Sequence, residues 1–237
     1  MRLIFAGPTI HALDLPPTSE YQLRPPAAQG DLYRAVEAGA NVIGLIDGIY
    51  EYVPAIWHKE ILYGLSKGVH VFGAASMGAL RAAECAAFGM VGVGDIYEAY
   101  ADGRLENDSD VAQSHAPAEM HYLPLSEPLV NVRATLSLCL RRSLITETEH
   151  DLLQTAAETI FFKDRTYRRL VRTAITENAR ASTILAILRD NAVDLKGDDA
   201  RRLIEAVIAT PDQRFVPAFD WQFEATHFWK TLFPPAA

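Results

Sequence analysis

One serine, Ser76, lies at a position where a protein could use it as a nucleophile. It lies in the stretch VHVFGAASMGALRAAE, from Val69 to Glu84, where a strand-like apolar run ends in small residues, Ser76 follows, and a helical pattern begins at once. This strand–Ser–helix order is that of a nucleophile elbow, whose sharp turn requires small neighbours. The pattern here is A-A-S-M-G rather than G-x-S-x-G. Such a serine could attack an acyl carbon, and the backbone N–H of Met77 could donate to the oxyanion.

Two other interpretations of this corner stay open. A serine at a strand-to-helix junction is often only the N-cap of the helix, and spacing alone favours that role for Ser76. The segment from Gly73 to Gly78 could also bind a phosphate at the helix N-terminus. It matches neither G-x-x-x-x-G-K-[ST] nor G-x-G-x-x-G, so a nucleotide loop is weakly supported.

A nucleophilic serine needs a base, and His58 is the first candidate. It falls in the early turns of a predicted helix that starts at Pro54, while Asp47 ends the preceding predicted strand. Asp47, His58 and Ser76 could therefore form a triad, because geometry rather than chain order defines one. The plainer interpretations are a surface imidazole for His58 and turn chemistry for Asp47.

Charged residues flank these candidates. Glu84 lies eight residues after Ser76 on the same predicted helix, roughly two turns on, so the two could share access to a ligand. Arg81 could pair with Glu84 or Glu60, and Lys59 is typical of a solvated helix face. Spacing does not decide which carboxylate, Asp47, Glu60 or Glu84, would assist His58.

A metal site is not expected. The seven histidines and two cysteines form no recognised ligand spacing, although His115 and His121 with Glu119 between them are weak candidates. The chain has two cysteines, Cys85 and Cys139, and for a cytosolic protein two reduced thiols are expected rather than one disulfide.

Predicted strands and helices alternate in the first half of the chain. The strands are LIFAGPT (3–9), NVIGLIDG (41–48) and VHVFGA (69–74), and the helices are DLYRAVEAGA (31–40), PAIWHKEILYGLSKG (54–68) and MGALRAAECAAFG (77–89). This order predicts a parallel sheet with right-handed crossovers. Ligands bind outside the carboxyl ends of such strands, which is where Asp47 and Ser76 fall.

The second half is irregular after residue 94 and then helical from about 129 to 209. Its last helical pattern, DLKGDDARRLIEAVIAT, is expected to start at a cap at Asp198 or Asp199. We therefore predict an α/β fold, an open and mostly parallel sheet flanked by helices, followed by an all-helical C-terminal part. The division is placed at 1–120 and 121–237.

Composition narrows the function classes. The 237 residues are 49% hydrophobic and 22% charged, which is ordinary for a globular protein, and the net charge of −8 makes nucleic acid a poor main partner. The N-terminus is not a signal peptide, and nothing approaches the ~18 apolar residues of a membrane span. We expect a cytoplasmic protein with no membrane partner.

Several long strings resemble the TfuA-like family. They are PPAAQGDLYRA, GLIDGIYEYVPAIWHKEIL, GVHVFGAASMGALRAAECAAFGMVGVGDIYEAY, SDVAQSHAPAE and PLSEPLVNVRATL. The resemblance runs in order from about Ile4 to about Leu136, and residues from about Thr146 onward carry no motif that can be placed.

The resemblance implies a role beside YcaO enzymes, which use ATP to activate a peptide amide and make thioamides with a TfuA-like partner. It implies a hydrolase that opens a thiocarboxylated, ubiquitin-like (ThiS-like) sulfur-carrier protein and releases sulfide, with the precursor peptide as a further partner. No cofactor of its own is implied, since ATP belongs to the YcaO partner.

On this hypothesis Ser76 attacks the thiocarboxylate, His58 is the base and Asp47 orients it. The amides of Met77 and Gly78 bind the oxyanion, while Lys59 or Arg81 meets the negative charge. The alternative is a non-catalytic adaptor that activates the YcaO enzyme or recruits the carrier.

Overall fold

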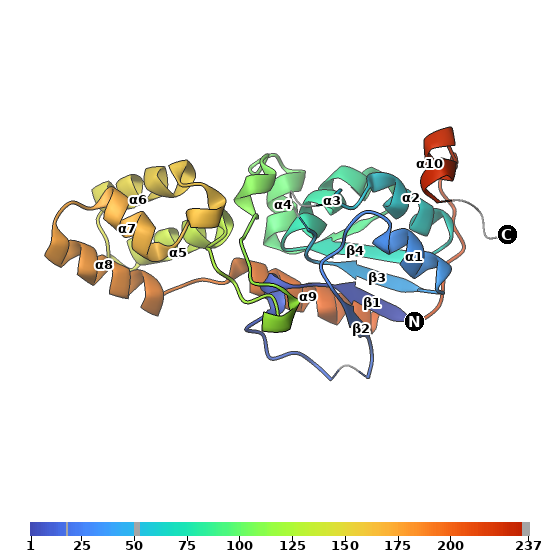
Figure 1. The fold of residues 1–237 in the computed structure, drawn as a ribbon, viewed down its shortest axis with the longest axis horizontal. Coiled ribbons are helices and arrows are strands. Elements are labelled where there is room, and N and C mark those ends of the chain that lie inside the picture. The colour runs from blue at the N-terminus through green and yellow to red at the C-terminus, as the bar shows by residue number, and fades with distance from the viewer. Residues whose placement is uncertain (18, 50–52, 234–237) are drawn as a thin grey trace.

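A five-stranded parallel sheet forms the centre of the computed structural model, which describes residues 1–17, 19–49 and 53–233 (Figure 1). Its strands are β1 (Arg2–Phe5), β2 (Gln22–Arg24), β3 (Val42–Leu45), β4 (His70–Ala74) and β5 (Val91–Val93). Their order is β2-β1-β3-β4-β5, and every neighbouring pair is parallel. The predicted open parallel sheet is confirmed, and the three predicted strands occupy its centre.

Helices flank and extend this sheet. They are α1 (Asp31–Glu37), α2 (His58–Ser66), α3 (Met77–Cys85), α4 (Asp95–Ala101), α5 (Leu129–Arg141), α6 (Glu147–Thr159), α7 (Tyr167–Ala174), α8 (Asn178–Asp190), α9 (Leu195–Ala209) and α10 (His227–Leu232). Short 3-10 turns lie at η1 (Pro8–Ile10), η2 (Ala86–Phe88), η3 (Asp108–Asp110), η4 (Ala118–Met120) and η5 (Phe162–Asp164). No helix in the described residues is long and apolar enough to cross a membrane.

The two faces of the sheet have different covers. Alternate residues of a strand point to opposite faces, so Leu3 and Ile43 join the core under α1, α2 and α3, whereas Ile4 and Val42 join a second core under α9. Gly44 allows α9 to approach, because a Cβ there would lie 2.7 Å from Leu203 Cδ2. Both faces are thereby buried, as parallel sheets require.

Helices α5 to α8 pack around a separate apolar core at one end of the molecule (Figure 1). The chain then returns to the sheet through α9. The predicted division at residue 120 groups α9 and the tail with this helical part, but in the structure both lie against the α/β part. The reason is the apolar stripe of α9, whose buried residues face the second side of the sheet.

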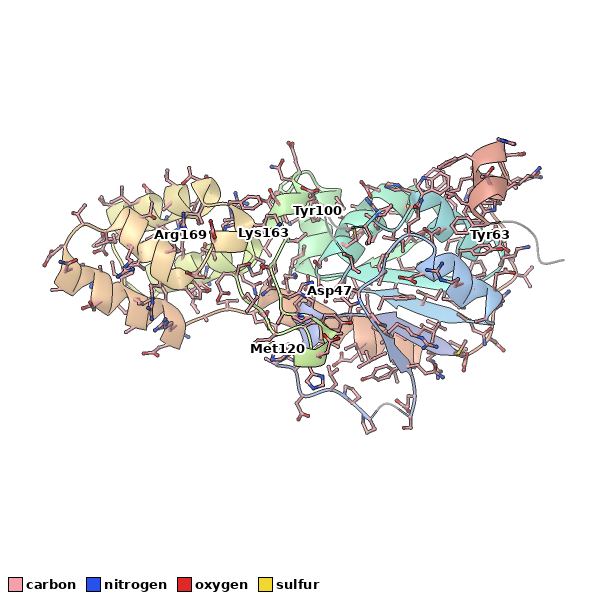
Figure 2. The ribbon with its side chains drawn as sticks, in the orientation of Figure 1. Asp47, Tyr63, Tyr100, Met120, Lys163 and Arg169 are labelled. Atoms are coloured by element: carbon pink, nitrogen blue, oxygen red, sulfur yellow. The ribbon has the colours of Figure 1, made fainter. Side chains whose placement is uncertain are left out.

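The aromatic tail packs on α1 and α2. The Trp229 ring of α10 lies 5.2 Å from Tyr63 and 5.6 Å from Tyr33, measured between ring centroids. Figure 2 shows Tyr63 at the end of the molecule remote from α5–α8. The tail therefore lies at the opposite end of the sheet from the candidate site described below.

Candidate active site

The chain makes a strained turn between β4 and α3. The Ser76 amide donates to the Ala74 carbonyl at 2.7 Å, and Ala75 between them has φ +65°. This three-residue turn with a positive φ is rare for a residue other than glycine, and such strain is found at functional sites. Small neighbours are needed, since a Cβ at Gly73 would lie 2.1 Å from the Gly78 carbonyl oxygen. The sharp turn expected around Ser76 is present.

Ser76 occupies the N-cap position of α3 without acting as a side-chain cap. Its hydroxyl makes no capping hydrogen bond, and within residues 1–17, 19–49 and 53–233 it has no other hydrogen-bond partner. The residue is only 3% exposed, and it lines a cavity. The bond that would explain Ser76 as a simple cap is therefore missing.

The cavity measures ≈ 180 Å³ and opens outside the carboxyl ends of β1, β3 and β4. Figure 2 places Asp47, one of its walls, between the sheet and the helical part. The walls of the cavity come from the strand ends, the segment 113–122, η5 and α9. The lining residues are Pro8, Pro25, Pro26, Asp47, Gly48, Ile49, Ser76, Gln113, Ser114, His115, Tyr122, Phe162, Lys163 and Lys196.

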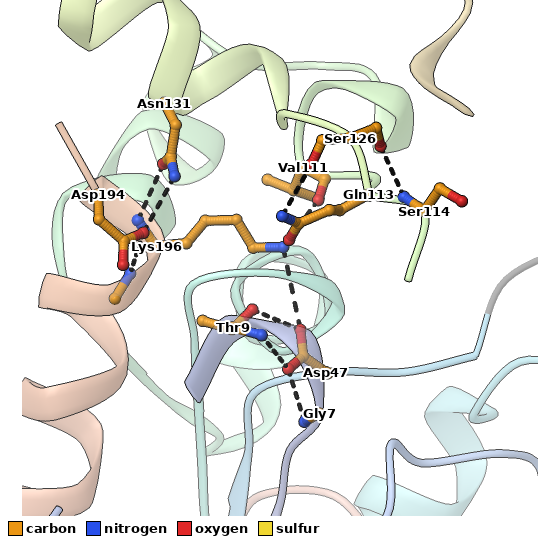
Figure 3. A network of polar contacts seen from close by, with 11 residues as sticks. Gly7, Thr9, Asp47, Val111, Gln113, Ser114, Ser126, Asn131, Asp194 and Lys196 are labelled. Carbon is orange, nitrogen blue, oxygen red and sulfur yellow. Dashed lines mark hydrogen bonds and ion pairs between the residues drawn. The ribbon is translucent and has the colours of Figure 1, made fainter. Parts of the chain in front are cut away.

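Asp47 is buried and held by the loop after β1. Its Oδ2 accepts the amides of Gly7 at 2.8 Å and Thr9 at 3.1 Å, and its Oδ1 accepts the Thr9 hydroxyl at 2.6 Å (Figure 3). These three donors stabilise a carboxylate anion. Asp47 therefore joins the ends of β1 and β3 and supplies a fixed negative charge to the cavity.

Lys196, in the first turn of α9, is the buried cation of this site. Its Nζ donates to the Val111 carbonyl at 3.0 Å and lies 3.9 Å from Asp47 Oδ1 (Figure 3). Burial lowers the pKa of the Lys196 ammonium, and the Asp47 carboxylate acts in the opposite direction. A lysine in these surroundings can hold an anion or take a proton.

Sequence reasoning missed Lys196 because no motif marks it. The expected cap at Asp198 or Asp199 is wrong by one turn: Asp194 is the N-cap, and its side chain accepts the Gly197 amide at 3.0 Å. Asp194 is followed three residues later by Gly197, which is a weak signal for a helix N-cap. The sequence therefore predicts a start of α9 that is too late.

His58 lies outside the cavity. Its Nε2 is 2.7 Å from Glu84 Oε2, Arg81 also bonds Glu84, and the Arg81 Nε donates to the Ile56 carbonyl at 3.1 Å. The three side chains form a cluster between α2 and α3 on the surface. The predicted assembly of Asp47, His58 and Ser76 is thus divided, since Asp47 and Ser76 share the cavity while His58 pairs with Glu84. The cause is the inward face of α2, which Ile61 and Leu65 occupy.

The predicted binding residues are also separated. The Gly78 amide donates to the Ile46 carbonyl at 3.1 Å, so it is committed to the fold rather than free for an oxyanion. A Cβ at Gly78 would lie 1.8 Å from the Leu45 carbonyl oxygen, so this glycine allows α3 to pack on β3. Met77 N–H has no acceptor among the described residues, as an oxyanion donor requires. Lys59 lies over the Phe223 ring, 5.5 Å from its centroid, and does not line the cavity.

His115 is a second possible base in the cavity wall. Its Nδ1 is 2.8 Å from the Ala116 carbonyl oxygen, and because a carbonyl only accepts, Nδ1 carries a proton and Nε2 is the atom that could accept one from a neutral ring. Among the described residues, no group of three or more His, Cys, Asp or Glu side chains is placed to hold a metal ion.

Comparison with known families matches residues 47–166 of the 237 to the family described as TfuA-like protein. The search of curated proteins finds no match. The matched range includes Asp47, Ser76 and the cavity wall from Gln113 to Tyr122. Lys196 lies beyond it.

Proposed function

Because this chain belongs to the TfuA-like family, we propose that it is an accessory protein of a YcaO enzyme in peptide thioamidation. In this proposal it hydrolyses a thiocarboxylated, ubiquitin-like sulfur-carrier protein and releases sulfide in the cytoplasm. One observation carries the hydrolase assignment: the Ser76 hydroxyl caps nothing, sits at a strained turn and lines a cavity that also holds Asp47 and Lys196.

The proposed reaction is acyl transfer. Ser76 Oγ attacks the carbon of the thiocarboxylate, its proton passes to a base in the cavity, and Met77 N–H donates to the developing oxyanion. The proton then moves from the base to the sulfur as the C–S bond breaks, so that HS⁻ leaves, and water hydrolyses the ester to return a carboxylate on the carrier. The step needs no cofactor from this chain, because hydrosulfide is a better leaving group than hydroxide and ATP is used by the YcaO enzyme on the peptide amide.

The shape and charge of the cavity suit this substrate. A thiocarboxylate is an anion, and two cavity-lining lysines, Lys163 and Lys196, offer positive charge. Pro25, Pro26 and Tyr122 narrow the entrance, which favours a thin, extended chain end such as a Gly-Gly tail over a bulky side chain.

The test is sulfide release without the YcaO enzyme. Purified protein mixed with thiocarboxylated carrier is expected to liberate sulfide, and Ser76→Ala is expected to lower the rate at least ~100-fold because the nucleophile is lost. Ser66→Ala is the matched control, since the Ser66 hydroxyl only bonds the Tyr63 carbonyl at the end of α2. A Ser76→Ala protein that releases sulfide at the wild-type rate would contradict the assignment.

The second candidate is a non-catalytic adaptor. It is favoured by two exposed apolar side chains close in sequence to the cavity wall, Met120 and Leu125, each of which is 53% exposed. Met120 is labelled in Figure 2. Such a surface could dock the YcaO enzyme, the carrier or the precursor peptide. The adaptor function predicts that Ser76→Ala supports thioamidation by the YcaO enzyme as well as the wild type does when free sulfide is supplied.

A further inference from the structure

We infer that one face of α7 is the docking surface for an acidic region of the sulfur-carrier protein, whose tail enters the neighbouring cavity. This α7 basic face consists of Arg168, Arg169 and Arg172. The inference rests on the proposed function, because it names the surface by which the same site receives its protein substrate. It also gives the α5–α8 bundle a function of its own.

The first argument is reach. An extended chain spans about 3.4 Å per residue, so a carrier whose last few residues fill the cavity keeps its folded body close to the cavity mouth. Among the described residues, the segments 11–26, 113–125 and 161–174 each line the cavity and also have exposed residues. The carrier body is therefore expected to contact one or more of these segments.

The second argument is the charge of these segments. Residues 11–26 contain two acidic residues and one basic residue, and residues 113–125 contain Glu119 with no lysine or arginine. The segment 161–174 contains one acidic residue, Asp164, and five basic ones, which are Lys163, Arg165, Arg168, Arg169 and Arg172. In a chain with a net charge of −8, this concentration of positive charge favours an acidic partner, because complementary charges steer association and disfavour like-charged proteins.

The third argument is the geometry of the α7 basic face. Leu170 and Val171 are buried in the bundle core, whereas the three arginines are exposed. The arginines are spaced by three and four residues, so they lie together on the solvent side of the helix. Guanidinium groups suit carboxylates, because their planar donors form paired hydrogen bonds. The face can therefore bind several acidic side chains of one partner.

Other charges of the molecule leave this face available. Arg169 lies 3.5 Å from Asp164 in an exposed pair, whereas the side chains of Arg168 and Arg172 have no ion pair or hydrogen bond in the part of the chain that the structure describes. Two carboxylates of the neighbouring helix α6 pair with arginines of other helices, Glu149 with Arg180 and Glu158 with Arg133.

Exposed aromatic surface adjoins the cavity at the start of this segment. Phe161 is 55% exposed, and its ring centroid lies 4.7 Å from that of Phe162, which lines the cavity. Lys163 Nζ lies over both rings, 5.8 and 5.7 Å from their centroids. Protein interfaces concentrate binding energy in aromatic and arginine residues, so we expect Phe161 to contact the carrier together with the α7 basic face.

Arg165 fixes the start of α7 relative to the cavity. It is 3% exposed, and it donates from Nε to the Ala157 carbonyl at 2.9 Å and from Nη2 to the Ile160 carbonyl at 3.3 Å. Its own carbonyl accepts the Glu127 amide at 2.6 Å. These bonds join α7 to the end of α6 and to the segment before α5. Figure 2 shows Lys163 at the junction of bundle and sheet, with Arg169 further along the bundle.

The test compares the whole carrier with its tail alone, using the full chain. In Arg168→Glu/Arg172→Glu, the KM for sulfide release from the thiocarboxylated carrier is expected to rise about 10-fold or more, with kcat within about twofold of wild type. The KM for a thiocarboxylated peptide ending in Gly-Gly should change less than about twofold, because the peptide reaches the cavity without touching α7. The matched control, Arg141→Glu/Arg189→Glu, makes the same change in net charge at exposed arginines outside α7 and should leave both KM values near wild type.

Salt gives a second readout that needs no variant. Between about 20 and 500 mM salt, the wild-type KM for the carrier should rise at least about 5-fold more than that for the peptide, since exposed charge pairs are screened. This measurement decides if the double variant unfolds in a thermal melt, and equal salt dependence for carrier and peptide overturns the inference.

The remaining outcomes also decide. A carrier KM in the folded double variant within about twofold of wild type overturns the inference. An equal rise in the control variant, or for the peptide, also overturns it, because net charge or damage to the cavity would then be the cause. Loss of binding to a DNA oligonucleotide in the double variant, with carrier binding unchanged, overturns it and assigns the face to nucleic acid.

Failure of the proposed function is distinguishable from failure of this inference. If the wild-type protein releases no sulfide, the proposed function fails, and calorimetric titration with the carrier in its carboxylate form tests the surface separately. Binding that is about 10-fold or more weaker in Arg168→Glu/Arg172→Glu than in wild type supports the docking surface, whereas equal binding overturns it.

Discussion

At the scale of single residues, the site combines one strained residue with one hydroxyl that has no hydrogen-bond partner in the described part of the chain. Ala75 holds a positive φ in a fully buried position, and Ser76 directly after it makes no capping bond. Backbone strain of this kind costs of order 1–3 kcal/mol and persists only where the surroundings impose it. Here the surroundings are backbone atoms packed closely on both sides of the turn. Gly73 lies against the Gly78 carbonyl, and Gly78 lies against the Leu45 carbonyl.

Ala75→Val is expected to destabilise the protein by about 2–4 kcal/mol. A β-branched side chain disfavours the left-handed conformation, and the extra methyl groups must enter a site that is already full. The measurement is urea unfolding, with Ala101→Val on the exposed end of α4 as the control, expected to cost well under ~1 kcal/mol. Equal losses in the two variants would show that the turn is not strained.

His58→Gln is expected to change sulfide release by less than about twofold. The imidazole pairs with Glu84 on the surface, and an exposed pair of this kind contributes at most ~1 kcal/mol to folding. A loss of sulfide release as large as that of Ser76→Ala would instead restore the triad interpretation of Asp47, His58 and Ser76. The assay is the same sulfide measurement, made beside a thermal melt.

At the scale of elements, buried carboxylates hold helix ends together. Glu60 accepts the amides of Gly30, Tyr33 and Trp57, so it joins the starts of α1 and α2 rather than assisting His58. Asp199 in α9 accepts the amides of Asp95 and Ile96 at 2.9 and 2.8 Å and thereby ties α9 to the start of α4. Each carboxylate satisfies amides that a helix leaves without partners.

Asp199 gives a pH-dependent prediction. Burial raises the pKa of Asp199 from 3.8 to about 6, while the two amides and Arg202 act in the opposite direction. The folded state therefore binds this proton more tightly than the unfolded state, so the contribution of Asp199 is most favourable below about pH 4 and is lost as the pH rises through about 6.

Asp199→Asn is expected to remove that dependence. Between about pH 4 and 7, the free energy of unfolding of the wild type should fall relative to that of the variant, by at most ~3 kcal/mol. Asp198→Asn is the matched control, because Asp198 is exposed and pairs with Arg201. Parallel curves for wild type and Asp199→Asn, measured by urea unfolding across this pH range, would contradict the prediction.

At the scale of the whole molecule, the chain leaves the sheet, builds the α5–α8 bundle, and returns to close the second face with α9 (Figure 1). The return puts Lys196 beside Asp47. The packing of α9 on β3 should therefore control both stability and the shape of the cavity that Lys196 lines.

Gly44→Ala tests this coupling. The added Cβ would meet Leu203 Cδ2 at 2.7 Å, so the single variant is expected to lower the free energy of unfolding by about 1–3 kcal/mol and to slow sulfide release as α9 shifts. Leu203→Ala alone should cost about 2–5 kcal/mol. Together the two changes should cost less than their sum by at least ~0.5 kcal/mol, because the small side chain at 203 makes room for the methyl group at 44. Strict additivity in urea unfolding would contradict the packing described.

Local patterns were enough to predict much of the fold. Continuous apolar runs predicted β1, β3 and β4, and the starts of α1 at Asp31 and of α3 at Met77 are where the sequence placed them. The predicted start of α2 at Pro54 is wrong, because α2 begins at His58 after Trp57. β2 and β5 were not predicted, because each has three residues at an edge of the sheet and too short a pattern to show a period. The predicted end of α9 agrees with the structure, but its predicted start does not. The reason is that Asp194, the N-cap, is followed closely by Lys196-Gly197, a pair that resembles a turn.

The sequence by itself determined that Asp47 and Ser76 end neighbouring parallel strands, because strand alternation and small residues are local properties. Only the tertiary structure decided what surrounds them. It directed His58 to Glu84, because the buried stripe of α2 fixes which side of that helix faces out. It also brought Lys196 from the far end of the chain to Asp47, because a parallel sheet must cover both faces and α9 supplies the second cover. Contacts of that kind depend on how helices pack, and no spacing within a motif records them.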